Sequence, residues 1–230
     1  MKTVGLIGGM SWESTIPYYQ ILNEAVKKQL GGLHSAKILL YSVDFYEIEA
    51  CMSRGDWDAA ARLLGDVAER LEHAGADLIL ICTNTLHKVA PQVQQRIHVP
   101  LVHIAEAAAD ALLEKNIRKV ALLGTKYTMT QEFYRDVLQK RGIEVLIPEG
   151  EDIDLVNRVI FEELCLGIVN DSSKREYLRI IRTMEKRGAS ALLLGCTELG
   201  LILSQNDVTL PLFDTTVIHA KKASDLSLGK

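Results

Sequence analysis

The sequence lacks any apolar run long enough to cross a membrane. Its densest apolar stretch covers only Leu78–Cys82, whereas a spanning helix needs about 20 such residues. The N-terminal segment reaches Gly8-Gly9 too early to hold the apolar region of a signal peptide. We therefore expect no membrane partner and a cytoplasmic location.

An excess of charge of one sign is also missing. The 230 residues include 26 Lys+Arg and 30 Asp+Glu, which gives a formal net charge of -4. Nucleic-acid-binding proteins usually carry a basic face, so we expect no nucleic-acid partner. Because 48% of the residues are hydrophobic, the chain can bury a sizeable core in one large domain or two small ones.

Cysteine is scarce and scattered, with no Cys-x-x-Cys pair. The six histidines are equally dispersed and show no metal-ligand spacing with a cysteine. We expect free thiols in a reducing compartment and no metal site. The four cysteines are Cys51, Cys82, Cys165 and Cys196.

Short apolar runs alternate with amphipathic stretches, a pattern that predicts an α/β fold with mainly parallel strands. Strands are predicted at residues 4–7, 39–43, 78–81, 120–124, 145–147, 191–194 and 212–213, with another beginning at Pro100. Helices are predicted from Ser14 to Gly31, with Pro17 in the first turn, and at 56–74, 105–114, 128–140 and from about Thr215. Two more are expected between Asp152 and Arg187.

The two halves of the chain repeat one another. Val4–Gly8 matches Val120–Gly124 at an offset of 116, and Gly75-Ala76 matches Gly188-Ala189 at 113. Val99–Leu101 matches Leu210–Leu212 at 111. Three matches in one order predict two similar, pseudo-symmetric α/β lobes with an active site in the cleft between them. The predicted lobes are residues 1–104, joined by the C-terminal helix 215–230, and residues 105–214.

Polar turns follow the third strand of each copy, where ligands gather in parallel sheets. They read Cys82-Thr83-Asn84-Thr85 and Gly195-Cys196-Thr197-Glu198, and the offset of 113 aligns Thr83 with Cys196. Two proton-bearing groups on opposite sides of a substrate can invert a carbon: one removes the Cα proton, and the other protonates the opposite face. A thiolate is accessible near neutral pH, especially at a helix N-terminus.

These turns carry a resemblance to the aspartate/glutamate racemase family. Its motifs are Gly8-Gly9-Met10-Ser11-Trp12-Glu13-Ser14-Thr15, Thr83-Asn84-Thr85-Leu86-His87, Gly124-Thr125 and Gly195-Cys196-Thr197-Glu198, which span essentially the whole chain. The resemblance implies a racemase of amino acids, aspartate or glutamate, that needs no cofactor and forms a homodimer. It also implies that Cys196 is one catalytic residue and that Thr83 stands where the other catalytic cysteine belongs. Glutamate racemases proper resemble the chain less, because they carry His where Glu198 stands.

Thr83 departs from the family pattern and predicts an asymmetric enzyme. A hydroxyl is a far weaker acid than a thiol, so Cys196 is expected to be the competent base and Thr83 the weaker partner. Neighbouring residues in extended chain point to opposite sides, and the gapless register favours Thr83 over Cys82. A bulge at the strand end would present Cys82 instead.

Further residues are expected to bind substrate. Glu198 either orients or activates Cys196, or caps its helix, and a polar loop after the second strand is expected to hold Met52 and Arg54. Arg54 or Lys126 could bind an acidic side chain. The expected substrate-binding residues are Met10, Ser11, Met52, Asn84, Thr85, Thr125, Thr197 and Glu198.

Composition alone does not exclude pyridoxal phosphate, since Lys126 or Lys88 could form a Schiff base. We interpret His87 as a structural histidine. Three alternative functions stay open: a racemase with broad specificity for neutral amino acids, a one-sided decarboxylase or isomerase of the same superfamily, and a carboxylate-binding protein that has lost activity.

Overall fold

The computed structural model describes residues 1–230. The chain folds into two compact units: unit 1 is Met1–Ile104 with Thr216–Lys230, and unit 2 is Ala105–Thr215. Each unit contains its own parallel sheet, of three strands in unit 1 and four in unit 2. The predicted fold class, two similar α/β lobes with mainly parallel strands, is confirmed.

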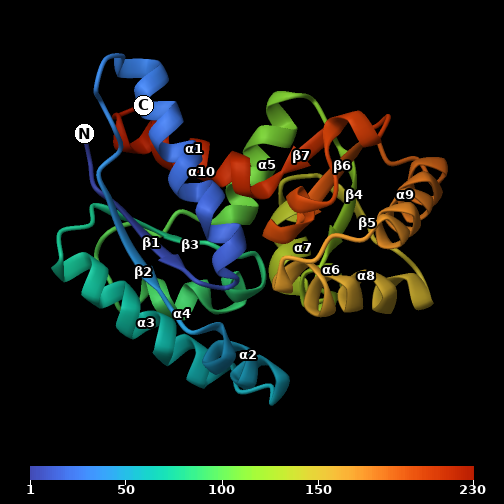
Figure 1. The fold of residues 1–230 in the computed structure, drawn as a ribbon, viewed down its shortest axis with the longest axis horizontal. Helices are drawn as coiled ribbons and strands as arrows, with labels where there is room; N and C mark the ends of the chain where they lie inside the picture. Colours follow the sequence, from blue (N-terminus) through green and yellow to red (C-terminus); the bar gives the residue numbers. More distant parts are fainter. The chain divides into compact units, whose positions relative to one another are not determined.

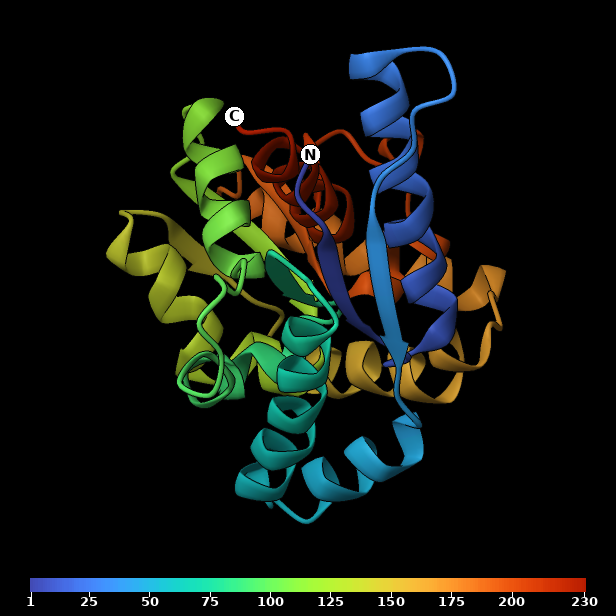
Figure 2. The same ribbon diagram turned by 90° about the vertical axis from the view of Figure 1, so that its left-hand side faces the viewer.

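Unit 1 is built on the strand order β2 (Ile38–Ser42), β1 (Val4–Gly8) and β3 (Leu78–Ile81). Helices α1 (Trp12–Leu30) and α10 (Thr215–Ser227) pack with β1 and β3 in one core cluster, although they lie at opposite ends of the sequence (Figure 1). Helix α3 (Trp57–His73) contacts all three strands. The remaining elements are α2 (Phe45–Ser53), η1 (Thr85–Val89) and α4 (Ala90–Gln94). Both termini lie close together, and Lys2 N donates to Ser227 O (Figure 2).

Unit 2 has the strand order β5 (Glu144–Leu146), β4 (Lys119–Gly124), β6 (Ala191–Gly195) and β7 (Leu212–Asp214). Apolar side chains of β4 and β6 form one core with α8 (Glu151–Glu162) and α9 (Asp171–Lys186). The other elements are α5 (Ile104–Glu114), α6 (Lys126–Thr130), α7 (Glu132–Lys140), η2 (Leu164–Leu166), η3 (Thr197–Leu201) and η4 (Gln205–Asp207).

The strand registers repeat at the offsets found in the sequence. Val4 pairs with Leu78 in unit 1, and Val120 pairs with Ala191 in unit 2. Those two pairs are separated by 116 residues on the first strand and by 113 on the third. The sequence repeat is therefore a repeat of backbone pairing as well as of composition.

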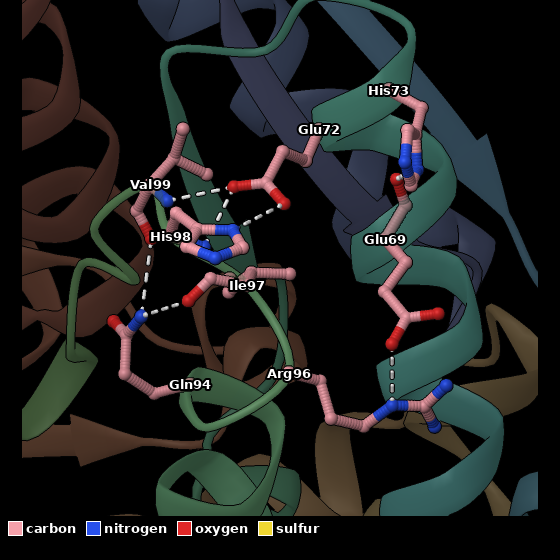
Figure 3. Close-up of polar contacts among 8 residues, drawn as sticks. All are labelled: Glu69, Glu72, His73, Gln94, Arg96, Ile97, His98 and Val99. Carbon is pink, nitrogen blue, oxygen red and sulfur yellow. Dashed lines mark hydrogen bonds and ion pairs between the residues drawn. The ribbon is translucent and has the colours of Figure 1, made fainter.

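Two glutamines make the same three hydrogen bonds in the two units. The Gln94 amide nitrogen donates to Ile97 O and Val99 O, and its oxygen accepts from Leu101 N (first two bonds in Figure 3). The corresponding bonds of Gln205 join Val208 O, Leu210 O and Leu212 N. Every partner is displaced by 111 residues. Each glutamine thus fixes the segment that leads into the last paired stretch of its sheet, which begins at Leu101 in unit 1 and at Leu212 in unit 2.

Glutamates on α3 and α9 reinforce the same segments. Glu72 Oε1 accepts from His98 N at 2.7 Å and from Val99 N at 2.8 Å (Figure 3). These bonds hold the pKa of the Glu72 carboxyl below its usual value. In unit 2, Glu185 Oε1 accepts from the hydroxyl of Thr209 at 2.8 Å.

Three sequence predictions need correction. Helix α1 begins at Trp12, with Ser11 as its extended N-cap residue, so Pro17 lies in the second turn and leaves the Glu13 carbonyl without its helical donor. Met52 lies in helix α2, which the Asp44 side chain caps, and not in a loop. The predicted helix 128–140 is two helices, because Gln131 has extended backbone angles.

The predicted fourth strand of unit 1 is reduced to one bridge between Ile79 and Leu101. In unit 2 the equivalent pairing continues to Leu194 and Asp214. In unit 1 the ring of His219 bonds Val102 O at 2.8 Å, and this carbonyl is the acceptor that would extend the pairing. The His219 side chain of α10 therefore takes the place of the next backbone hydrogen bond between the two strands.

Candidate functional site

The two polar turns occupy equivalent places in their sheets. Ile81 pairs with Ile7 in unit 1, and Leu194 pairs with Leu123 in unit 2. Thr83 and Cys196 each follow two residues after those pairs. Each turn stands at the carboxyl end of a parallel strand, where backbone groups and side chains become accessible to a ligand.

Cys82 faces the core of unit 1. Its side chain is fully buried and packs with Leu80, Tyr18 and Ala220, among others. Burial alone raises the pKa of the Cys82 thiol. Its backbone N–H donates to Ile7 O at 2.9 Å, so the strand pairing continues to this residue without a bulge. The alternation of side chains along a strand then favours Thr83 as the ligand-facing residue.

Cys196 lies beside an acidic group in its own turn. The Cys196 Sγ donates to Glu198 Oε2 at 2.8 Å, and the Thr197 hydroxyl donates to the same oxygen at 3.0 Å. Burial raises the pKa of the Cys196 thiol well above its ordinary value, and the Glu198 carboxylate raises it further. The resting group is therefore a thiol with a proton acceptor already in hydrogen-bond contact.

Thr83 is held through its backbone. Thr83 O accepts from the imidazole of His87, with Nδ1 at 2.8 Å. Thr83 is 8% exposed. Its hydroxyl makes no hydrogen bond, in contrast to the Cys196 thiol, which donates to Glu198.

The expected substrate-binding residues of unit 1 divide into two groups. Met10, Ser11, Asn84 and Thr85 lie in the turns that follow β1 and β3, and all four are buried. The carbonyl of Ser11 accepts from the Thr15 hydroxyl at 2.8 Å. Met52 does not share these turns, since it is a buried residue of α2.

Close backbone contacts shape the turn after β1. Gly9 has φ +93°, and a Cβ there would collide with the carbonyl oxygen of Val43. Its N–H donates to Thr15 Oγ1 at 2.9 Å. Only glycine combines this positive φ with so close a backbone neighbour.

In unit 2 the expected binding residues flank Cys196 and the end of β4. Thr125 is the extended N-cap residue of α6, and its hydroxyl accepts from Thr128 N at 3.3 Å. Thr197 and Glu198 follow Cys196 directly and are buried. Glu198 is thus placed to act on Cys196.

The candidate cations differ in their surroundings. Lys126 Nζ pairs with Asp154 Oδ1 at 2.7 Å, and Lys88 Nζ lies 3.9 Å from the centre of the Trp57 ring. Burial lowers the pKa of Lys88. Arg54 is exposed at the C-terminal end of α2 and makes no ion pair. Of the three, Arg54 is the one whose charge is not already neutralised or covered.

No group of three or more His, Cys, Asp or Glu side chains is arranged to hold a metal ion. Among the helices, none combines the length and the apolar character needed to span a bilayer.

Comparison with known proteins identifies the family of this chain. A family model described as Asp/Glu/hydantoin racemase matches residues 7–223. The chain belongs to this family. The matched residues include both polar turns.

Solved structures of racemase relatives superpose on the complete chain. A candidate Asp/Glu racemase from Yersinia pestis is 54% identical, with 99% of this chain and 100% of that one covered and a TM-score of 0.92. An aspartate racemase homologue from Pyrococcus horikoshii is 38% identical over 99% and 100% of the two chains, with a TM-score of 0.85. A further relative, found by sequence, is the broad specificity amino-acid racemase RacX of Bacillus subtilis, which is 25% identical over 95% of both chains.

His87 is a buried histidine with backbone partners, in line with its interpretation as structural. Its partner, the carbonyl of Thr83, was not expected. The spacing of four residues between them was the available signal, because it is the spacing of one helical turn. Spacing alone could not show that a ring nitrogen, and not a backbone N–H, meets that carbonyl.

Proposed function

We propose that the protein is a cofactor-independent amino-acid racemase acting on aspartate or glutamate. Cys196 and Thr83 are its two acid/base groups, and they meet opposite faces of the substrate Cα. The observation that carries this proposal is the equivalent placement of the two residues at repeated strand ends, with Glu198 bonded to Cys196. Membership in the racemase family supports the reaction class.

The proposed reaction begins with the Cys196–Glu198 pair. The thiol proton passes to the Glu198 carboxylate, and the thiolate removes the Cα proton of one enantiomer, which restores the thiol. The carbanion then takes a proton on its other face from the Thr83 hydroxyl. Solvent reprotonates Thr83, and Glu198 releases its proton to solvent, so the resting carboxylate is restored. In the reverse direction Cys196 donates and Thr83 must accept, which is the harder step because a hydroxyl is a weak acid.

Buried polar groups of the turns are proposed to hold the substrate. Backbone N–H groups and hydroxyls at helix starts bind carboxylates well, and Asn84, Thr85, Thr125 and Thr197 lie at such positions. Met10, Ser11 and Met52 complete the proposed binding set, and Arg54 is proposed to pair with the side-chain carboxylate. Broad specificity remains the alternative, since the relative RacX is named for it.

Proton NMR in D2O tests the proposal. The purified protein, without added cofactor, is given each enantiomer of aspartate and glutamate, and both Cα–H loss and product chirality are followed. We expect exchange with inversion, and a loss of about 100- to 10,000-fold in Cys196→Ser. Cys51→Ser is the control, because that buried thiol lies in α2 of the other unit, outside both turns. Inversion that survives in Cys196→Ser would contradict the assignment.

Exchange with retained configuration would favour the second candidate, a one-sided isomerase or decarboxylase. The absence of a hydrogen-bonded base at the Thr83 hydroxyl is the observation that favours it. A homodimer is proposed from the family pattern, and light scattering on the purified protein tests it.

A further inference from the structure

Within unit 1, His87 joins the turn that contains Thr83 to Ile104, the last residue of the first segment of this unit. Its Nδ1 lies 2.8 Å from Thr83 O, and Ile104 N donates to its Nε2 at 3.1 Å. The side chain is 1% exposed. A single buried ring therefore fixes a backbone carbonyl at one edge and a helix N-terminus at the other.

The two partners determine the tautomer of the ring. An N–H group donates to Nε2, so Nε2 carries no hydrogen in this contact. A carbonyl can only accept, so Nδ1 must carry the proton. Burial lowers the pKa of His87 well below its usual value, and the nearby His103 and His219 lower it further. The ring stays neutral at physiological pH and keeps this orientation.

Unit 2 has no equivalent of this clamp. The residue 113 positions after His87 is Gly200, where a Cβ would lie 2.8 Å from Asp214 Oδ2. The turn of unit 2 instead carries the carboxylate that bonds Cys196. The clamp is therefore specific to the turn whose candidate group, Thr83, has no activating base.

We propose that His87 is a positioning residue for Thr83, holding its carbonyl so that the hydroxyl reaches the Cα of the substrate. This inference rests on the proposed racemase function. A weak proton donor depends strongly on placement, since an error of about 1 Å in a reacting group can cost about 100-fold in rate. Loss of the clamp would release the Thr83 turn while leaving the Cys196 turn untouched.

Two substitutions separate the two contacts of the ring. In His87→Asn the amide nitrogen can replace Nδ1 and still donate to Thr83 O. In His87→Gln the longer amide can replace Nε2 and accept from Ile104 N, but it leaves Thr83 O without its donor. His219→Gln is the matched control, because His219 is equally buried and its ring centre lies 5.7 Å from that of His87. It bonds Val102 O and the Tyr18 hydroxyl, not Thr83.

The measurement is the ratio of inverted product to total Cα deuteration in D2O, for the enantiomer that exchanges faster. A carbanion that Thr83 fails to protonate is deuterated by Cys196 with retained configuration. We expect the ratio to fall about 10- to 100-fold in His87→Gln and to stay near wild type in His87→Asn and His219→Gln. A change of stability alone lowers both exchange routes equally and leaves this ratio unmoved.

Two results would overturn the inference in different ways. An unchanged ratio in His87→Gln, with wild-type inversion intact, would remove the positioning role and keep the racemase. Absence of Cα exchange in the wild-type protein would remove the racemase proposal and the role of His87 with it.

Discussion

Glu198 stands where Thr85 stands in the first unit, so only one of two equivalent turns carries a carboxylate. The two residues are 113 positions apart, and both follow by two the residue aligned as acid/base group. The same repeated backbone thus presents a thiol with a proton acceptor in one unit and a lone hydroxyl in the other. This difference has consequences for the pKa of the Cys196 thiol and for the rate of racemisation, and both can be measured.

Replacing Glu198 by Gln should make the Cys196 thiol more acidic and yet slow the turnover. Loss of the neighbouring negative charge lowers the pKa of the Cys196 thiol, although burial still holds it above the ordinary value. Turnover falls nevertheless, since the amide cannot accept the thiol proton. Thiolate absorbance against pH, referenced to Cys196→Ser, gives the pKa, and polarimetry gives the rate. An unchanged or raised pKa in this variant would contradict the contact.

Thr83→Cys should increase racemisation by about tenfold or more. The new thiol is a stronger acid than the hydroxyl, and its thiolate is a usable base near neutral pH. The gain should be larger for the enantiomer that wild-type protein converts more slowly, because that direction needs a base at position 83. Rates for both enantiomers decide the matter, with Thr183→Cys as the control, because this exposed threonine of α9 lies outside both turns.

Cys82→Ala should retain turnover and lose a little stability. The side chain is fully buried in the unit 1 core, and removing one buried sulfur costs about 1 kcal/mol. Urea unfolding measures the stability and the NMR exchange assay the activity. Loss of activity in a folded Cys82→Ala protein would transfer the acid/base role from Thr83 to Cys82.

Acid should destabilise the protein through its buried histidines. The native pKa of His219 is lowered to about 3 by burial, and that of His87 is also lowered. The unfolded chain, with a histidine pKa near 6.5, therefore binds more protons once the pH falls below that value. This contribution to stability is complete above about pH 6.5 and is lost as the pH falls towards the folded value, by about 1.4 kcal/mol per pH unit for each histidine.

Urea unfolding at about pH 7.5 and about pH 5 measures this slope. His219→Gln should flatten it, since the amide has no proton to gain. The exposed His34 provides the control, and His34→Gln should leave the slope as in wild type. Equal slopes in all three proteins would refute the prediction.

Gln94→Met and Gln205→Met should cost similar amounts of stability. Each change leaves two carbonyls and one N–H without their side-chain partner, a loss of about 1–3 kcal/mol. The two glutamines share no partner, so the double variant should show the sum of the single effects. Urea unfolding of the three variants measures these losses. A stability loss in the double variant that differs clearly from the sum of the two single losses would contradict the prediction.

Strand positions and the internal repeat were predictable from the sequence because buried parallel strands are short apolar runs and their turns recur at fixed intervals. The α2 helix was not, because Phe45–Ser53 is too short to show a clear helical period. The shortened fourth strand was equally hidden: His219, far along the chain, takes the carbonyl of Val102. At the site, Thr83 and Cys196 followed from alignment, whereas the His87 clamp depends on tertiary placement of one ring.

The division of the chain also bears on the order in which it can fold during synthesis. Unit 2 is one continuous stretch of chain, so all of its residues have been synthesised before Thr216 is added. Unit 1 begins first but waits for α10, whose His219 must reach the Tyr18 hydroxyl and Val102 O. Of the two units, the one that comes first along the chain is thus the last to close, and until then its core lacks Ala220 and Ala223. A nascent chain stalled before α10 would expose that apolar surface to chaperones.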